Sequence, residues 1–138
     1  MRKSYPFKNT LHIPSVLFTL ISNVNRQKRF LKQYLGVELR EAKEKNDGSL
    51  DKEDFKKITD YYGLAVPAIL GEALCVLRGK KMILQERLAL TLQGAMTGLG
   101  DDFFDKHDLA DDLINTLIET PDNLTGNSSA ERLFLSFY

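Results

Sequence analysis

The chain has 138 residues, a single cysteine and equal numbers of basic and acidic residues, 19 each, so its formal net charge is zero. This length allows one domain with a real core, spanning residues 1–138, and the neutral charge argues against a general nucleic-acid-binding surface. The lone Cys75 excludes an intrachain disulfide and suits a reducing compartment, so we expect a cytoplasmic protein that binds no nucleic acid.

The first predicted element is an amphipathic helix that opens at Pro14, runs to Leu35 and stops at Gly36. Its apolar start, residues 13–21, follows three basic residues and so imitates a secretory signal, but no small-residue cleavage site follows it. We therefore expect a structural helix. No run of about 18 apolar residues occurs in the chain, which predicts no membrane span.

A turn signal and a helix start come next. Asn46-Asp47-Gly48 is typical of a tight turn. Asp51 is a good N-cap residue with Asp54 at the third helical position, which predicts a helix that continues to Tyr62 and ends at Gly63.

The most apolar segment is residues 64–77, in which Pro67 fits the first turn of a new helix and Cys75 is expected to be a buried, inert thiol. The basic sequence from Arg78 to Lys81 follows. It is either an anion contact or, the favoured reading, a helix C-cap with solvated lysines.

A further helix is predicted from Leu84 to about Phe104, and Ser128 with Glu131 forms a capping box before a last amphipathic helix that has begun when the chain stops at Tyr138. No stretch alternates with a period of two residues. The sequence therefore predicts an all-α domain, an antiparallel helical bundle.

The acidic sequence Asp101-Asp102-Phe103-Phe104-Asp105 follows a segment, residues 88–100, that carries no charge. Carboxylates this close resist joint ionisation unless a cation meets them. On a helix Asp101 and Asp105 share one face, about 6 Å apart along the axis, and Asp102 borders it. Mg²⁺ takes carboxylate oxygens, so the pattern indicates a metal site. The alternative is an acidic, solvated helix face.

Small residues line the helix face that leads into these aspartates. Gln93 or Gly94, and then Thr97 or Gly98, precede Asp101 at helical spacing, and we expect this strip to leave room for a large apolar group beside it. The acidic run continues with His107, Asp108, Asp111 and Asp112, of which the aspartates either extend the same face or begin a following helix.

An apolar helix that runs directly into D-D-x-x-D, here residues 88–105, resembles the class I isoprenoid (terpenoid) synthase superfamily, which includes prenyltransferases and terpene cyclases. The preceding segment, residues 66–74, is also similar to the apolar helix before this motif in the family. The resemblance covers about residues 62–112 and implies the all-α fold of that superfamily.

The resemblance implies a metal-dependent reaction. Asp101 and Asp105 would be the main Mg²⁺ ligands and Asp102 a secondary one, holding the diphosphate of an allylic prenyl substrate. The metal ions would act as Lewis acids while the substrate ionises, and prenyl transfer or cyclisation would follow, the work of a transferase or a lyase.

The resemblance also suggests substrate-binding residues. Met96 and Thr97 match positions that line the hydrocarbon cavity of prenyltransferases. Arg78 and Lys81 are candidates for contacts to the diphosphate, although their surroundings match no family motif.

The chain departs from the family in lacking the second metal motif on a facing helix. We therefore expect about half of the terpenoid synthase fold, the N-terminal part of a longer enzyme, inactive alone and associating through its uncovered apolar faces as a homodimer. The competing hypotheses are a non-enzymatic helical interaction domain whose acidic face binds a protein partner, and a degenerate homologue without chemistry.

Overall fold

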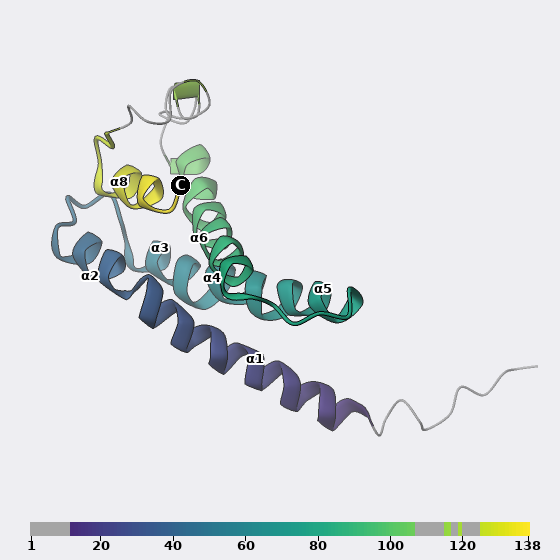
Figure 1. Cartoon of the computed structure of the whole chain (residues 1–138). Helices are drawn as coiled ribbons and strands as arrows, with labels where there is room; N and C mark the ends of the chain where they lie inside the picture. Colours follow the sequence, from purple (N-terminus) through teal and green to yellow (C-terminus); the bar gives the residue numbers. More distant parts are fainter. Residues whose placement is uncertain (1–11, 107–114, 117–118, 120–124) are drawn as a thin grey trace, which may run out of the picture.

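The computed structural model describes residues 12–106, 115–116, 119 and 125–138, and the regular structure across these residues is entirely helical. The all-α prediction is confirmed, and the helices pack as a bundle (Figure 1). The helices are α1 (Ile13–Tyr34), α2 (Gly36–Glu44), α3 (Lys52–Lys56), η2 (Lys57–Tyr61), α4 (Tyr62–Ala65), η3 (Val66–Gly71), α5 (Glu72–Leu77), α6 (Leu84–Lys106) and α8 (Ser129–Ser136).

Segments α3 to α5 form one continuous helix, Lys52–Leu77, so the predicted end at Gly63 and the predicted new start at Pro67 are wrong. Two π-helical segments, η2 and η3, interrupt its α-helical hydrogen bonding. Pro67 has no N–H to donate to the Gly63 carbonyl four residues earlier. The side-chain amide of Gln27 donates to that oxygen at 3.0 Å, so α1 supplies a donor where the proline cannot.

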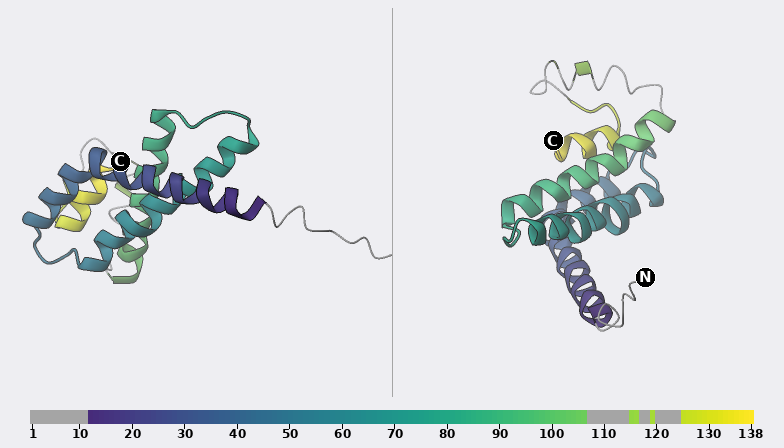
Figure 2. Two further views of the ribbon diagram at one scale, coloured as in Figure 1. Left: turned by 90° about the horizontal axis from the view of Figure 1, so that it is seen from below. Right: turned by 90° about the vertical axis from the view of Figure 1, so that its right-hand side faces the viewer.

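Helix α6 packs closely along this continuous helix (Figure 2). A Cβ added at Gly94 would lie 2.5 Å from the Tyr62 carbonyl oxygen, and one at Gly98 would lie 3.1 Å from the Tyr62 ring. The small-residue strip is therefore a helix–helix contact and leaves no room beside it for an apolar group, which corrects the expectation from the sequence.

The first helix ends where the sequence predicts, with Leu35 as its C-cap, but Gly36 then begins α2 directly, which the sequence analysis did not predict. The Leu35 N–H donates to the Leu31 carbonyl and the Leu39 N–H donates to the Leu35 carbonyl, at 2.9 and 3.0 Å. Leu35 itself is almost fully buried. The chain thus bends at a core leucine whose own N–H and carbonyl groups are both hydrogen-bonded.

The main core lies where α8 meets the C-terminal part of α6. We use the name α8 end for α8, the C-terminal part of α6 and residues 45–51 together. The Phe103 and Phe134 rings pack edge to face there, with centroids 5.3 Å apart. The buried apolar residues of this cluster are Leu31, Leu35, Leu50, Ile58, Leu64, Ala95, Leu99, Phe103, Ala130, Leu133, Phe134 and Phe137.

Both predicted N-caps are present. The Asp51 carboxylate accepts from the N–H groups of Glu53 and Asp54, and Asp54 accepts from the Asp51 N–H in return. At α8, Ser128 Oγ accepts from the Glu131 N–H at 3.1 Å, while the Glu131 side chain accepts from the N–H of Asn127, one residue before the expected partner.

Among the described residues one helix, Lys52–Leu77, is long and apolar enough to cross a membrane by length and composition alone. It satisfies this criterion because the helix is continuous through Gly63 and Pro67, where the sequence predicts a helix end and a new start. Core helices of globular domains satisfy the same criterion. Here 33% of the apolar window is buried within the bundle, including Leu64 and Ala68.

Candidate functional site

The D-D-x-x-D motif lies on the last turns of α6, which remains helical through Lys106. Asp101 is exposed and Asp102 is buried, so neighbouring carboxylates of the motif face different surroundings. The backbone of Asp105 is helical, one turn after Asp101, and its side chain lies outside the described residues. His107, Asp108, Asp111 and Asp112 also lie outside them.

Asp102 forms an ion pair with Lys57 of η2, with 2.5 Å between Oδ1 and Nζ. Both side chains are largely enclosed, with relative exposures of 12% for Asp102 and 25% for Lys57. The pair joins the π segment to the end of α6, and removing one partner would leave the other charge poorly solvated. Sequence analysis missed it because the residues lie 45 positions apart.

The described part of the chain offers a metal few ligands. No three His, Cys, Asp or Glu side chains gather there closely enough to hold a metal ion. Asp101 supplies one exposed carboxylate. Mg²⁺ typically takes one or two protein carboxylates and completes its shell with water and phosphate oxygens. The chemistry of Asp101, with Asp105 on the same helix face, fits such a metal when a diphosphate accompanies it.

Arg78 and Lys81 lie at the other end of α6 from the motif. Both Nη atoms of Arg78 bond the Glu86 carboxylate at 2.5 Å, which fixes Arg78 beside the first turns of α6. Glu86 and Asp101 are 15 residues apart on one helix, about 22 Å along its axis. Arg78 and Lys81 therefore do not share one site with the aspartates.

The turn after α5 is a helix cap, which is the reading that the sequence favours. The Lys80 N–H donates to the Cys75 carbonyl and the Gly79 N–H to the Val76 carbonyl, both at 3.1 Å, with Gly79 at a φ of 68°. This is a Schellman arrangement, which suits glycine. Cys75 is buried, as predicted.

Met96 and Thr97 lie one turn before the motif but face different ways. Met96 is half-buried and packs against the core cluster. Thr97 is exposed, and its hydroxyl donates to the Gln93 carbonyl at 2.8 Å. Of the two, only Thr97 is on the surface, while Met96 is committed to the core.

A buried polar cluster joins α1, α4, α5 and α6, and sequence analysis missed it. The Gln27 amide donates to Thr91 Oγ1 at 2.8 Å as well as to Gly63, and its oxygen accepts from Arg87 at 3.1 Å. Arg87 also forms an ion pair with Glu72. The sequence contains one indication that Gln27 is buried. It lies three residues after Val24 and four before Leu31, on the apolar stripe of the first helix.

This cluster adjoins a groove between the N-terminal half of α1 and η3–α5. The groove has a volume of about 940 Å³, and most of its fourteen lining residues are apolar or uncharged. Its charged residues are Arg26 and Glu72, which pair at 3.2 Å, and Lys81. We call this part of the molecule, with the turn at residues 78–83, the groove end.

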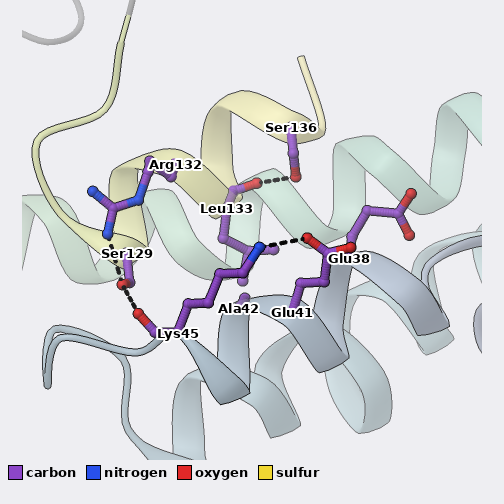
Figure 3. A pocket seen from close by; sticks show the side chains of 8 residues that line it. All are labelled: Glu38, Glu41, Ala42, Lys45, Ser129, Arg132, Leu133 and Ser136. Carbon is purple, nitrogen blue, oxygen red and sulfur yellow. Dashed lines mark hydrogen bonds and ion pairs between the residues drawn. The ribbon is translucent and has the colours of Figure 1, made fainter.

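A smaller pocket of about 250 Å³ lies between α2 and α8 (Figure 3). Several of its polar groups already bond one another: Lys45 pairs with Glu41 at 3.1 Å, and Arg132 donates to Ser129 Oγ at 3.0 Å. Ser129 in turn donates to the Lys45 carbonyl at 3.2 Å. These contacts join α8 to α2 and leave the pocket without a convergent set of groups for a ligand.

Comparison with known proteins gives no match: no protein-family model, no curated protein and no solved structure is similar to this chain.

Proposed function

We propose that this protein binds the diphosphate of a prenyl substrate through Mg²⁺ at Asp101 and Asp105, in the manner of a class I isoprenoid synthase. The observation that carries the proposal is the position of the motif: it follows an uncharged segment and lies on a helix that continues through Lys106, with Asp101 exposed at its end. The sequence resemblance gives the reaction class, prenyl transfer or terpene cyclisation.

The three aspartates have different tasks in this proposal. Asp101 and Asp105 are one helical turn apart and serve as the metal ligands. Asp102 is held by Lys57 and positions the end of α6 against η2. When bound, Mg²⁺ supplies positive charge that stabilises the departing diphosphate. Asp102 is therefore a positioning residue, in contrast to its expected role as a secondary ligand.

Calorimetry and thermal melting test the proposal with Mg²⁺ and a non-ionisable thiolodiphosphate analogue of an allylic prenyl diphosphate. We expect neither component alone to bind, because one or two carboxylates hold Mg²⁺ weakly, and both together to raise Tm by about 4 °C at a tenfold excess over Kd. Asp101→Asn is expected to abolish the joint response without lowering the basal Tm, since Asp101 is exposed.

Asp60→Asn is the matched control, because Asp60 is an exposed aspartate on the continuous helix and outside the motif. It is expected to retain the full response. An equal response from wild type, Asp101→Asn and Asp60→Asn would show that binding does not use the motif. No response from the wild-type chain would rule out diphosphate binding by this chain.

A second candidate function is a non-enzymatic helical interaction domain. The exposed apolar surface at the groove end favours it, because contiguous apolar patches on a protein surface commonly mark interaction sites. Leu77 is 83% exposed and Val76 is 79% exposed there. The diphosphate titration separates the two functions, since an interaction domain gives no Mg²⁺-dependent response.

A further inference from the structure

The N-terminal half of α1 carries apolar side chains on two faces. Val16 and Leu20 face the groove. Ile13, Leu17 and Ile21 recur every fourth residue on another face and are all more than half exposed. In the right-hand view of Figure 2 this half of the helix projects away from the other helices. An apolar helix face normally packs against another surface, so a helix with exposed apolar side chains beside its groove-facing side has a face still to be covered.

No charged residue occurs between His12 and Arg26, so the uncovered face of α1, defined by Ile13, Leu17 and Ile21, is uncharged as well as apolar. The groove beside it carries little net charge, because Arg26 and Glu72 pair with each other and Lys81 is the remaining charged residue of its lining. An uncharged apolar helix face and a groove lined mostly by apolar or uncharged residues are complementary surfaces on one molecule.

We propose that two copies of this chain form a two-fold symmetric dimer in which the uncovered α1 face of each copy lies in the groove of the other. The two α1 helices then run antiparallel, and each covers the exposed wall of the partner's α5, represented by Val76 and Leu77. Each surface meets its complement twice, as an isologous interface requires.

The size and charge of the surfaces favour a second copy over a charged ligand. The fourteen groove residues and the three of the uncovered α1 face approach the roughly 20 to 30 residues per partner of a stable interface. An anionic peptide or a lipid headgroup is recognised by several cations, and of the two that line the groove Arg26 is already paired with Glu72, which leaves Lys81. A neutral helix needs no counter-charge.

Sedimentation equilibrium of the full chain over a wide concentration range tests the dimer. Leu17→Glu and, separately, Val76→Lys are each expected to raise the dimer Kd about a hundredfold, because each buries an unpaired charge. Both residues are exposed in the single chain, so neither change is expected to lower Tm at low concentration. Val37→Glu, at an exposed valine of α2, is the matched control and leaves the dimer intact.

Mixing the two variants gives a sharper test of the arrangement. In a mixed dimer the new Glu of one copy faces the new Lys of the other, and the second contact keeps its native Leu17 and Val76. The mixture is therefore expected to recover at least tenfold of the lost affinity, whereas either variant alone stays weak.

Three results would overturn the proposal: a monomer at all concentrations, a dimer that Leu17→Glu and Val76→Lys leave unchanged, or a mixture no tighter than its components. A fourth comes from flotation with neutral and anionic phosphatidylcholine–phosphatidylglycerol vesicles. The neutral vesicles are phosphatidylcholine alone and the anionic ones contain phosphatidylglycerol as well. The α1 face binds a lipid surface, and not a second copy, if the wild-type chain remains monomeric and floats with either kind of vesicle while Leu17→Glu does not float.

Discussion

The two ends of the bundle differ in how far their apolar side chains are covered and in how they use polar contacts. At the α8 end Leu133 and Phe134 are buried, whereas at the groove end Val76 and Leu77 are almost fully exposed. Asp47 at the α8 end accepts from the Ser129 N–H at 2.8 Å and meets Arg132 at 3.3 Å, which fixes the start of α8. The α8 end is complete within one chain, while the groove end presents a surface that a partner can cover.

The largest expected effect comes from emptying the core of the α8 end. Phe134→Ala is expected to lower the free energy of unfolding by about 3 to 5 kcal/mol, because it removes the ring that packs on Phe103. Leu77→Ala at the groove end is the contrasting truncation and is expected to change stability by less than about 0.5 kcal/mol in the monomer. Urea unfolding at low protein concentration measures both. Equal losses would contradict the difference between the two ends.

Breaking the ion pair between Arg87 and Glu72 is expected to cause the second-largest loss of stability. Arg87→Met leaves the Gln27 oxygen without its donor and Glu72 with Arg26 as its remaining partner, and is expected to cost about 2 to 3 kcal/mol in urea unfolding. The same change at Arg132, which is half-exposed beside Asp47, is expected to cost less than about 1 kcal/mol. A small loss at Arg87 would show that the cluster does not join the ends.

A methyl group inserted between the central helices is expected to cost less. Gly94→Ala places Cβ 2.5 Å from the Tyr62 carbonyl, so α6 must move, at about 1 to 3 kcal/mol. Gly36→Ala has open space around the new Cβ and is expected to stabilise by about 0.4 to 1 kcal/mol. Thermal melts of the pair measure the difference. A stabilising Gly94→Ala would mean that the two helices are farther apart than described.

Loss of one helix cap is expected to be a moderate change at the α8 end. Asp51→Ala removes the acceptor for the Glu53 and Asp54 N–H groups and is expected to cost about 1 kcal/mol. Asp51→Asn keeps an acceptor oxygen and is expected to retain most of the stability. If both variants lose the same amount in urea unfolding, the charge matters and the hydrogen bonds do not.

The smallest expected effects are on how stability depends on pH. Each end of the bundle has a carboxylate with a lowered pKa, Glu86 at the groove end and Asp47 at the α8 end. Arg78, followed by the Ile83 N–H, lowers the pKa of Glu86 to about 2 at the groove end. Hydrogen bonds from Ser49, followed by Ser129, lower the pKa of Asp47 far below its usual range at the α8 end. A lowered pKa in the folded state gives stability that is present at neutral pH and is lost as the carboxylate is protonated in acid.

Stability from Glu86 is therefore expected to fall between its ordinary pKa of 4.5 and about 2. Glu86→Gln is expected to lower Tm at neutral pH and to make Tm fall less steeply over this pH range. Asp47→Asn is expected to remove the acid-dependent part of Tm that Asp47 contributes. Melting curves at a series of pH values give the comparison. An unchanged pH profile in Glu86→Gln would contradict the contribution of the Arg78 pair.

Local signals in the sequence predicted the local structure well. The Asp51 cap, the Asn46-Asp47-Gly48 turn and the Gly79 cap depend on residues within five positions of one another, and all three are present. The break between Gly63 and Pro67 was predicted from local signals too, but it is wrong. The donor that makes a helical Pro67 tolerable comes from Gln27, 36 residues before Gly63, which no local pattern reveals.

In the candidate site, too, the local features were predicted from the sequence and the long-range contacts were not. Helical spacing alone predicted that Asp101 and Asp105 share a face of one helix, and α6 does continue through both. The partner of Asp102 was beyond reach, because Lys57 is 45 residues away and reaches it from a π segment. The distance between Arg78 and the motif could not be predicted from the sequence either, because it depends on where the chain turns after α5 to meet the start of α6.

Gln27 has a consequence for how α1 finds its place. Apolar side chains on two faces would let the first half of α1 dock in more than one rotational setting at similar free energy. The amide of Gln27 meets acceptors on Gly63 and Thr91 and a donor on Arg87 in only one of those settings. Any other setting would bury the amide without partners. One polar side chain thus selects the register of a helix whose apolar residues cannot.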